Sequence, residues 1–430
     1  IFWFECLFWM CVNCLSLLIG SKGGGLIKVI SFMFPVTSKI DGGVQSLVVA
    51  LVNELVLFND VKVRLYDYSF GLVYNKLTPK VREGIEFVSL DLSGWCINNL
   101  GDETFVLTDF LWLKYPYFFK NTNGVRLLML DVYYPNWRRF YRAKNIIIPF
   151  VKKEAVRVLS EKKAVIFIED KGLKEFEAIG GYGCKDDCVV PIPFKVGDSQ
   201  GLTKAFDLNN SKRKVVFGYI SRAVRWKVMP VIKLIEDLVA ANINFKLVVY
   251  TNSRLDFKEI LCERIAMSEY DIDFIEGASG AKLKESIVSN IDIGYAMGTA
   301  SLEFAALKVP ALLADFSEKY FPDEYKYRWL YEADKGNVGL DLVDISSFGE
   351  RHSIADVLAS DLSRASTLSY EYVKANHDST FVAKKVVRAA ERTTMTTRDI
   401  KALVFYPYFL TYLIKRVVRQ NKKFFGWGIK

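Results

Sequence analysis

The sequence predicts an α/β protein of two tandem Rossmann-like domains that face a central cleft, followed by C-terminal helices. Three observations support this fold class. The chain has 430 residues, which is enough for two domains with complete cores. In both halves, apolar runs of strand length alternate with segments of helical apolar spacing, as is typical of parallel sheets covered by helices. A polar stretch at 197–213 separates the two halves and is the expected linker.

The first half alternates from its first apolar run onward. The run at 26–34 predicts a buried strand, the apolar spacing at 44–58 a helix, and the alternation at 61–66 a second strand. Further strands are expected at 104–107, 125–130, 145–148 and 164–168. Residues 26–196 are therefore the predicted N-terminal domain. The apolar leader at 1–25, which lacks the positively charged start of a signal peptide, is expected to lie outside the fold.

The second half restarts the alternation after the linker. Strands are expected at 215–220, 245–250, 272–275, 291–295 and 310–314, and helices at 230–241 and 299–307. Pro230 is expected in the first turn of its helix, where its missing N–H has no intrahelical partner to lose. Residues 214–350 are thus the predicted second domain, and 351–430 are predicted to hold C-terminal helices and a basic, aromatic tail.

Composition narrows the classes of partner and compartment. The net charge of +9 fits a phosphate-bearing ligand or an anionic membrane surface better than an acidic partner. No nucleic-acid partner is expected, because the positive charges are spread out and no nucleic-acid-binding motif is present. Seven cysteines without a framework spacing indicate free thiols in a reducing compartment. We expect no bound metal: the two histidines do not stand at zinc-site spacing, and Asp271-x-Asp273, an Asp-x-Asp motif, precedes an ordinary strand.

Residues suited to phosphate binding follow the expected strands of the second domain, where ligands bind in open α/β sheets. Arg222 and Lys227 come after its first strand, and Gly298 and Thr299 come after a later one and begin a helix. Cations beside a helix N-terminus form a site for a phosphorylated ligand. Glu303, one turn inside that helix, is expected to face the cleft or pair with a cation, since an unpartnered buried carboxylate is costly. Together these residues predict a nucleotide-sugar site.

In their order and spacing, these motifs resemble those of the GT-B glycosyltransferases, especially the retaining group 1 that builds bacterial surface polysaccharides. In that group a Gly-Gly turn after the first strand touches the donor or the acceptor, and Gly42-Gly43 is similar to it. Arg222 and Lys227 match the five-residue offset between the cations that bind the donor diphosphate, with Ser221 in place of the family glycine. The resemblance extends over residues 26–345.

A second set of motifs adds to the resemblance and also departs from it. Gly277 is similar to a family glycine near the base, and the stretch from Glu303 to Pro310 resembles the second half of a Glu-x7-Glu motif that contacts sugar and ribose. The first glutamate of that motif falls at Tyr295, and Lys308 replaces the glycine before the proline.

The first domain also departs from the family, because it contains no histidine, whereas many relatives use one to contact the donor sugar. Asp109 and Asp131 occupy comparable strand ends and are the expected acceptor contacts.

The resemblance implies a metal-independent hexosyltransferase that acts in the synthesis of lipopolysaccharide O-antigen or capsule. A sugar would move from a UDP- or GDP-linked donor to a glycan or lipid-linked acceptor, with no cofactor besides that co-substrate. The implied catalytic residues are Glu303, Arg222 and Lys227. The implied donor-binding residues are Gly42, Gly43, Arg222, Lys227, Gly277, Gly298, Thr299, Ser301 and Glu303. Two alternatives stay open: a non-catalytic GT-B scaffold that binds nucleotide sugar or glycan, and a nucleotide-sugar 2-epimerase-like enzyme.

The last 30 residues differ from the rest of the chain. They contain seven Lys or Arg, no acidic residue and eight aromatic residues. Such a segment suits an interfacial membrane anchor, and it equally suits a helix whose apolar face packs across the first domain. We expect a cytoplasmic protein with peripheral attachment to the anionic inner face of the membrane.

Overall fold

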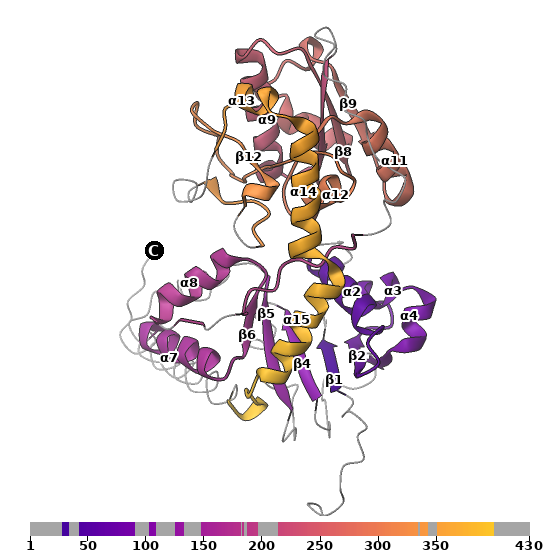
Figure 1. Ribbon diagram of the computed structural model, residues 1–430, viewed down its shortest axis with the longest axis vertical. Coiled ribbons are helices and arrows are strands. Elements are labelled where there is room, and N and C mark those ends of the chain that lie inside the picture. The colour runs from indigo at the N-terminus through magenta and orange to yellow at the C-terminus, as the bar shows by residue number, and fades with distance from the viewer. Residues whose placement is uncertain are drawn as a thin grey trace, which may run out of the picture.

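The computed structural model describes residues 28–33, 43–90, 103–108, 125–132, 148–181, 183–184, 187–196, 214–333, 336–342 and 351–399. Within them the chain forms two α/β domains, one above the other in Figure 1, each built on a six-stranded sheet. The predicted fold class is thereby confirmed. The leader, the linker and the basic tail all lie outside the described residues.

The first domain has a wholly parallel sheet in the order β3-β2-β1-β4-β5-β6. Its strands are β1 (Lys28–Met33), β2 (Val61–Asp67), β3 (Glu86–Ser89), β4 (Glu103–Thr108), β5 (Arg126–Asp131) and β6 (Val165–Phe167). Its helices are α2 (Gly43–Leu55), α3 (Leu72–Lys76), α4 (Pro79–Gly84), α7 (Ile148–Glu161) and α8 (Asp170–Gly180). The strand expected at 145–148 is wrong at Ile148, which begins α7 in the structure.

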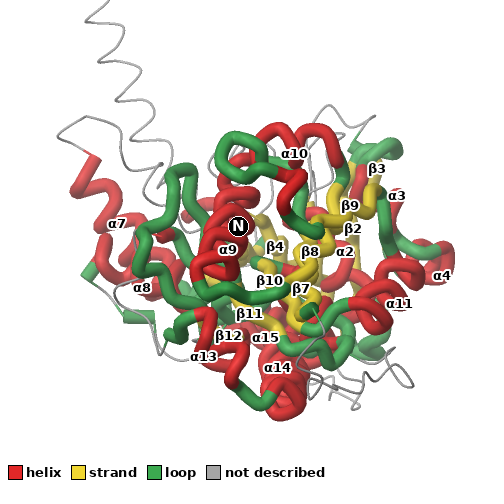
Figure 2. Tube along the Cα trace, turned by 90° about the horizontal axis from the view of Figure 1, so that it is seen from above, coloured by secondary structure: helices red, strands yellow, loops and turns green. Residues whose placement is uncertain are grey.

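The second domain repeats this plan in the order β12-β11-β10-β7-β8-β9, as Figure 2 shows, with only β12 antiparallel among its described strands. Its strands are β7 (Val215–Ile220), β8 (Phe245–Thr251), β9 (Ile272–Glu276), β10 (Ile293–Ala296), β11 (Ala311–Leu313) and β12 (Arg328–Trp329). Its helices are α9 (Arg225–Ala240), α10 (Arg254–Leu261), α11 (Gly280–Asn290) and α12 (Thr299–Ala306).

Helix α9 begins five residues before the expected position, so the placement of Pro230 in its first turn is wrong. The carbonyl of Val224 accepts hydrogen bonds from the backbone N–H groups of Lys227 and Val228, which closes a helical turn upstream of the proline. Val228 and Met229 are almost completely buried in the domain core, and their burial favours this earlier start. The earlier start carries Lys227 into the first turn of the helix.

The C-terminal helices α13 (Ile354–Ala359), α14 (Leu362–His377) and α15 (Ser379–Arg392) are divided between the domains. Helix α14 packs on the second domain, where the Ser366 hydroxyl donates to the Lys308 carbonyl at 2.6 Å. Helix α15 packs on the first domain, where the Ser379 hydroxyl donates to the carboxylate of Glu54 on α2 at 2.9 Å. In Figure 1 the two helices form one column that spans both domains.

A second connection crosses between the domains beside the junction of these helices. The backbone N–H of Phe194 donates to the His377 carbonyl, and the N–H of Ser379 donates to the Phe194 carbonyl. The fully buried imidazole of His377 is held at Nδ1 by the Ile192 carbonyl, 2.9 Å away. The chain therefore passes between the domains in two adjacent, hydrogen-bonded segments.

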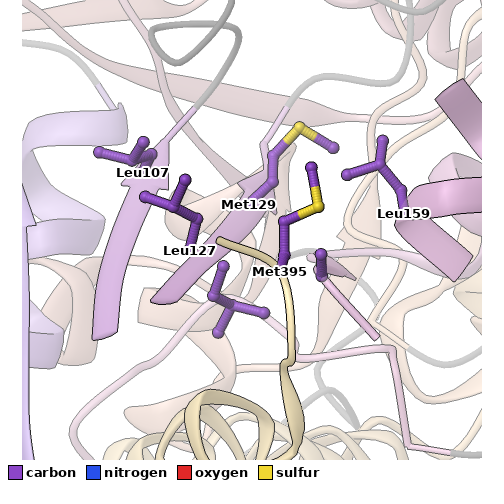
Figure 3. Close-up of a pocket in the computed structure, with 7 residues that line it drawn as sticks. Leu107, Leu127, Met129, Leu159 and Met395 are labelled. Atoms are coloured by element: carbon purple, nitrogen blue, oxygen red, sulfur yellow. The ribbon is translucent and has the colours of Figure 1, made fainter. Parts of the chain in front are cut away.

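The first-domain core contains a small cavity of about 10 Å³ (Figure 3). It is lined by Leu107, Leu127, Leu128, Met129, Leu159, Ala164 and Met395. This volume is about the minimum for one water molecule, and the lining side chains offer no polar partner. The cavity is a packing defect beneath Met395, which follows α15, and it does not bear on ligand binding.

Candidate functional site

The candidate site lies at the carboxyl ends of two neighbouring strands in the second domain. Strands β7 and β10 pair in parallel, with Phe217 opposite Ile293 and Gly218 opposite Gly294. Arg222 follows β7 by two residues and Gly298 follows β10 by two residues, so the two arrive at the same edge of the sheet. This juxtaposition is the one expected from the alternation of strands and helices.

Glycines in the two strands let helix α12 pack closely against this part of the sheet. A Cβ atom at Gly218 would lie 2.7 Å from Ile291 and 3.0 Å from the ring of Phe304 on α12. A Cβ atom at Gly294 would also overlap the Phe304 ring. Because these residues lack side chains, Phe304 packs directly on the sheet. This packing determines how close the N-terminus of α12 lies to the strand ends.

Lys227 is a half-buried cation in the first turn of α9. Its backbone carbonyl accepts the hydroxyl of Tyr219 at 2.5 Å, and its ammonium lies 5.0 Å from the centre of the Trp226 ring. Among the described residues, the ammonium has no hydrogen-bond or ion-pair partner. Burial, together with the nearby charge of Arg222, lowers the pKa of Lys227 to about 8. The exposed Arg222 guanidinium likewise has no such partner within the described ranges, so both cations are available to an anion.

Arg225, in the same helical turn, is engaged in a different set of contacts. Its guanidinium forms an ion pair with Glu263 at 2.6 Å and lies 5.9 Å from the centre of the Tyr320 ring. Trp226 packs edge-on against Phe316. Arg225 is thus paired within the protein, which distinguishes it from Arg222 and Lys227.

The turn before α12 is built from Gly298, Thr299 and Ser301. Gly298 has φ of 66°, which favours glycine, and its N–H donates to the Val338 carbonyl at 2.7 Å. The completely buried Ser301 hydroxyl donates to the Gly298 carbonyl at 2.8 Å, so it stabilises the turn from beneath. Thr299 is exposed. The structure thus presents Thr299 and the helix N-terminus at the edge of the sheet, with Ser301 as internal support.

Glu303 lies one turn further along α12 and is half-buried. Burial raises the pKa of its carboxyl, and the charge of Lys284 partly opposes this rise. No hydrogen bond or ion pair of this carboxylate is found in the described part of the chain. Glu303 is therefore a partly desolvated carboxylate on the helix that follows β10.

The glycines predicted to bind the donor lie at different parts of the two sheets. Gly277 follows β9 at the same edge as Arg222, has φ of 70°, and has no atom within 4 Å of the place where a Cβ would stand. Gly43 is the exposed first residue of α2 in the first domain, again with open space around it. Gly42 lies outside the described residues.

Of the two expected acceptor contacts, Asp109 and Asp131, the structure describes only Asp131. Asp109 lies outside the described residues. Asp131 is the last residue of β5 and is only 3% exposed. Its Oδ2 lies 3.0 Å from the place where a Cβ at Gly172, in the first turn of α8, would stand. Its carboxylate is therefore packed against the N-terminus of α8.

The two departures of the second domain from the GT-B Glu-x7-Glu motif lie in different surroundings. Lys308 has φ of 55°, and its ammonium lies 5.2 Å from the centre of the Tyr370 ring. Tyr295, at the place of the first motif glutamate, is completely buried on β10 with its ring 5.8 Å from Tyr219 and 5.7 Å from Tyr327. Asp271 and Asp273 lie at the amino end of β9, where they pair with Lys214 and Lys246. That end of the sheet is opposite to the candidate site. Among the described residues, no cluster of three or more potential metal ligands is found.

Residues 336–342 of the second domain, for which the sequence pattern predicts no role, reach the first domain. The Val338 carbonyl holds Gly298, and a Cβ at Gly336 would lie 2.7 Å from the Ile168 carbonyl and 3.5 Å from the Cα of Glu169. The carboxyl ends of the two sheets therefore meet across residues 336–342. Glu169 follows a predicted strand and precedes a helix, as Arg222 does. The same sequence pattern could therefore have identified Glu169 as a candidate site residue.

Comparison with known proteins gives matches at the level of structure. No protein-family model and no curated protein sequence matches the chain. A glycosyltransferase from Rickettsia africae matches with 13% identity and a TM-score of 0.51, over 85% of this chain and 98% of that chain. The apo form of the lipopolysaccharide outer core galactosyltransferase WaaB matches with 11% identity and a TM-score of 0.51, over 84% and 98% of the two chains.

A third match is an E. coli trehalose-6-phosphate structure with bound UDP-2-fluoro glucose, with 10% identity and a TM-score of 0.50. It covers 85% of this chain and 99% of that chain. Since these matches extend over both domains, they establish the arrangement of the whole fold.

Proposed function

Because the chain has the GT-B fold, we propose that it is a glycosyltransferase that moves a sugar from a nucleotide-sugar donor to a glycan or lipid-linked acceptor. The donor is UDP- or GDP-linked, the transferred group is a hexose, and the pathway is the synthesis of a cell-surface polysaccharide such as lipopolysaccharide O-antigen or capsule. The structural matches support this proposal, since one is a lipopolysaccharide galactosyltransferase and another contains a UDP-linked fluoro-sugar. Assignment to the retaining group rests on the sequence motifs.

The observation that carries the proposal is the pair of cations at the end of β7. Neither Arg222 nor Lys227 has a hydrogen-bond or ion-pair partner among the described residues, and the lowered pKa of Lys227 reflects its burial beside a second positive charge. Two like charges held together in this way are unfavourable without an anion. A nucleoside diphosphate would supply the missing negative charge at the same edge as the N-terminus of α12.

The proposed mechanism follows from this charge distribution. Arg222 and Lys227 stabilise the negative charge that develops on the departing nucleoside diphosphate, and the N-terminus of α12 beside Thr299 contributes in the same sense. Glu303 accepts hydrogen bonds from hydroxyls of the ribose or the sugar. Because the cations neutralise the diphosphate, we propose that transfer does not require a metal and persists in excess EDTA.

The test begins with a thermal-shift screen of UDP- and GDP-sugars, because a ligand that binds the folded state raises its apparent stability. With the best donor, Lys227→Ala is expected to weaken binding by about 1.5–3 kcal/mol, the range for a charge-assisted hydrogen bond. Arg225→Ala is the matched control, since this cation in the same turn is already paired with Glu263. Calorimetric titration measures both affinities. Equal affinity of Lys227→Ala and the wild type removes Lys227 from the site.

A second candidate function is a scaffold that binds nucleotide sugar without turnover. The observation that favours it is Tyr295, which stands in the core where the family motif has a glutamate. Donor binding without product formation, with lipid-linked and soluble glycan acceptors both present, supports the scaffold and rejects the transferase.

We further propose that the protein acts in the cytoplasm, at the inner face of the membrane. In the part of the chain that the structure describes, no helix is both long and apolar enough to cross a bilayer. Attachment would then depend on the basic, aromatic segment at 401–430, which combines positive charge with residues that favour the interface.

A further inference from the structure

Glu169 lies at the carboxyl end of the first-domain sheet, directly opposite the second domain. It follows β6 and immediately precedes α8, and it makes no side-chain capping bond to that helix. Its Cα lies 3.5 Å from the place where a Cβ at Gly336 would stand. Gly336 has φ of 75°, and the absence of a side chain there permits this close approach of the two domains.

A short chain of contacts leads from Glu169 to the candidate donor site. Two residues after Gly336 comes Val338, whose carbonyl accepts the N–H of Gly298 at 2.7 Å. Gly298 is the residue directly before α12, the helix that carries Glu303. Glu169 therefore lies across the domain interface from the turn that the proposed donor would contact, on the side from which an acceptor would approach.

The Glu169 side chain is half-buried. No hydrogen bond or ion pair of its side chain is found among the described residues. The charged groups that face it there are Asp131 on β5 and Lys171 on α8. Burial and the charge of Asp131 raise the pKa of Glu169 to about 7, while Lys171 acts in the opposite direction. A hydrogen-bond donor from a ligand would stabilise the ionised form that the surroundings now disfavour.

Charge is separated across the domain interface. In the part of the chain that the structure describes, the second domain contributes Arg222 and Lys227, which have no hydrogen-bond or ion-pair partner there, whereas the charged groups around Glu169 in the first domain are Asp131 and Lys171. The charge of Asp131 beside Glu169 disfavours a phosphate or carboxylate of the acceptor at this point, while a neutral hydroxyl is a suitable donor to a carboxylate. The described surroundings of Glu169 thus favour an uncharged, hydroxyl-bearing group at this carboxylate.

We propose that Glu169 binds the acceptor by accepting a hydrogen bond from a hydroxyl of an uncharged sugar. This assignment rests on the proposed glycosyltransferase function and adds to it the residue and the chemical class of the acceptor group. Any phosphate or lipid of the acceptor lies away from Glu169.

The test measures transfer from the donor identified in the thermal-shift screen to octyl glucoside and octyl galactoside as neutral acceptor probes. Glu169→Ala is expected to raise the acceptor KM by about 10- to 100-fold, the range for losing a hydrogen bond to a charged group, and to leave the donor KM unchanged. Glu169→Gln retains the size of the side chain and one oxygen that can accept a hydrogen bond. Its KM for the acceptor substrate is therefore expected to lie between those of the wild type and Glu169→Ala. Glu83→Gln, on the exposed surface of α4, is the matched control and is expected to behave as the wild type.

The outcomes separate this assignment from the function on which it rests. If the wild type forms product and both Glu169 variants keep its acceptor KM, the assignment is wrong and the transferase function stands. If Glu169→Ala and Glu169→Gln raise the donor KM as much as the acceptor KM, Glu169 supports the fold at the interface and the assignment is again wrong. A wild type that binds donor but forms no product overturns the proposed function and the assignment with it.

Discussion

At the scale of single residues, contacts distinguish cations that the sequence presents as equivalent. Arg222, Arg225 and Lys227 lie within six residues of one another, and each follows the same strand. Arg225 is neutralised by Glu263, which lies 38 residues away in the chain. Arg222 and Lys227 have no ion-pair partner among the described residues. Burial and the charge of Arg222 lower the pKa of Lys227.

The lowered pKa of Lys227 makes donor binding depend on pH. Below pH 8 its ammonium is already protonated, whereas above pH 8 the free protein must take up a proton to bind a diphosphate. Affinity for a UDP-sugar is therefore expected to fall as pH rises above 8, by up to about tenfold per pH unit. Calorimetric titrations at neutral and alkaline pH measure this fall. Lys227→Arg keeps its charge and is expected to bind with little dependence on pH; an equal fall in this variant assigns the titration to another group.

At the scale of elements, glycines place the N-terminus of α12. Gly218 and Gly294 leave room on the sheet for Phe304, and Gly298 turns the chain from β10 into the helix. Gly218 lies on β7, Gly294 on β10 and Gly298 in the turn before α12. Together these three glycines determine the position of the first turn of α12.

Gly298→Ala is expected to lower the free energy of unfolding by about 1–3 kcal/mol, because φ of 66° is strained for any residue with a side chain. Nucleotide binding is expected to weaken as well, since the same turn presents the helix N-terminus. Chemical denaturation measures the first effect and calorimetry the second. Gly43→Ala is the control for stability, as Gly43 starts a helix without a positive φ and with open space around it. Equal stability of the two variants contradicts the role of the turn.

At the scale of the whole molecule, three segments of the described chain join the domains. Helices α14 and α15 bind one domain each, residues 191–196 run beside their junction, and residues 336–342 bring the second domain against the end of β6. The two sheets thereby meet at their carboxyl ends, where the proposed donor and acceptor residues lie.

Gly336→Ala is expected to separate the domains at this interface, because its Cβ would stand 2.7 Å from the Ile168 carbonyl, which is backbone and cannot move alone. Small-angle X-ray scattering should then show an increased radius of gyration. Donor binding to the second domain should be largely kept, while transfer should be lost. Gly181→Ala is the matched control: its φ of 68° imposes similar strain within the first domain, but no atom lies within 4 Å of the new Cβ. An unchanged radius for Gly336→Ala argues against the interface.

Membrane attachment is also a property of the whole chain. Each Lys or Arg near an anionic surface contributes about 1 kcal/mol, so the seven in the last 30 residues suffice for salt-sensitive binding. The full chain is expected to sediment with anionic vesicles at low salt and to stay in solution with neutral ones. Deletion of residues 415–430 is expected to release it while leaving nucleotide binding intact. A full-length protein that remains in the supernatant with anionic vesicles rejects the anchor.

Most of the fold follows from local pattern in the sequence. The strand at 215–220 was predicted with its observed bounds, and α2 and α12 were predicted to within a few residues, since apolar spacing along the chain reflects burial directly. Arg222, Lys227 and Gly298 could be placed at one edge of a sheet because parallel strands in this topology bring their carboxyl ends together. The start of α9 differs from the prediction. Pro230 indicates a helix that begins at residue 230, but burial of Val228 in the core favours a start at Arg225.

What the tertiary structure decides is which of these residues are unpaired and what faces them. The ion pair of Arg225, the burial of Tyr295 and the approach of Gly336 to Glu169 join segments that are distant in the chain, and no local pattern encodes such contacts. The two domains also share their C-terminal helices, which a division of the chain into successive segments does not reveal. Burial and pairing depend on neighbours in space, so the charge state and availability of the site residues emerge only when the chain is folded.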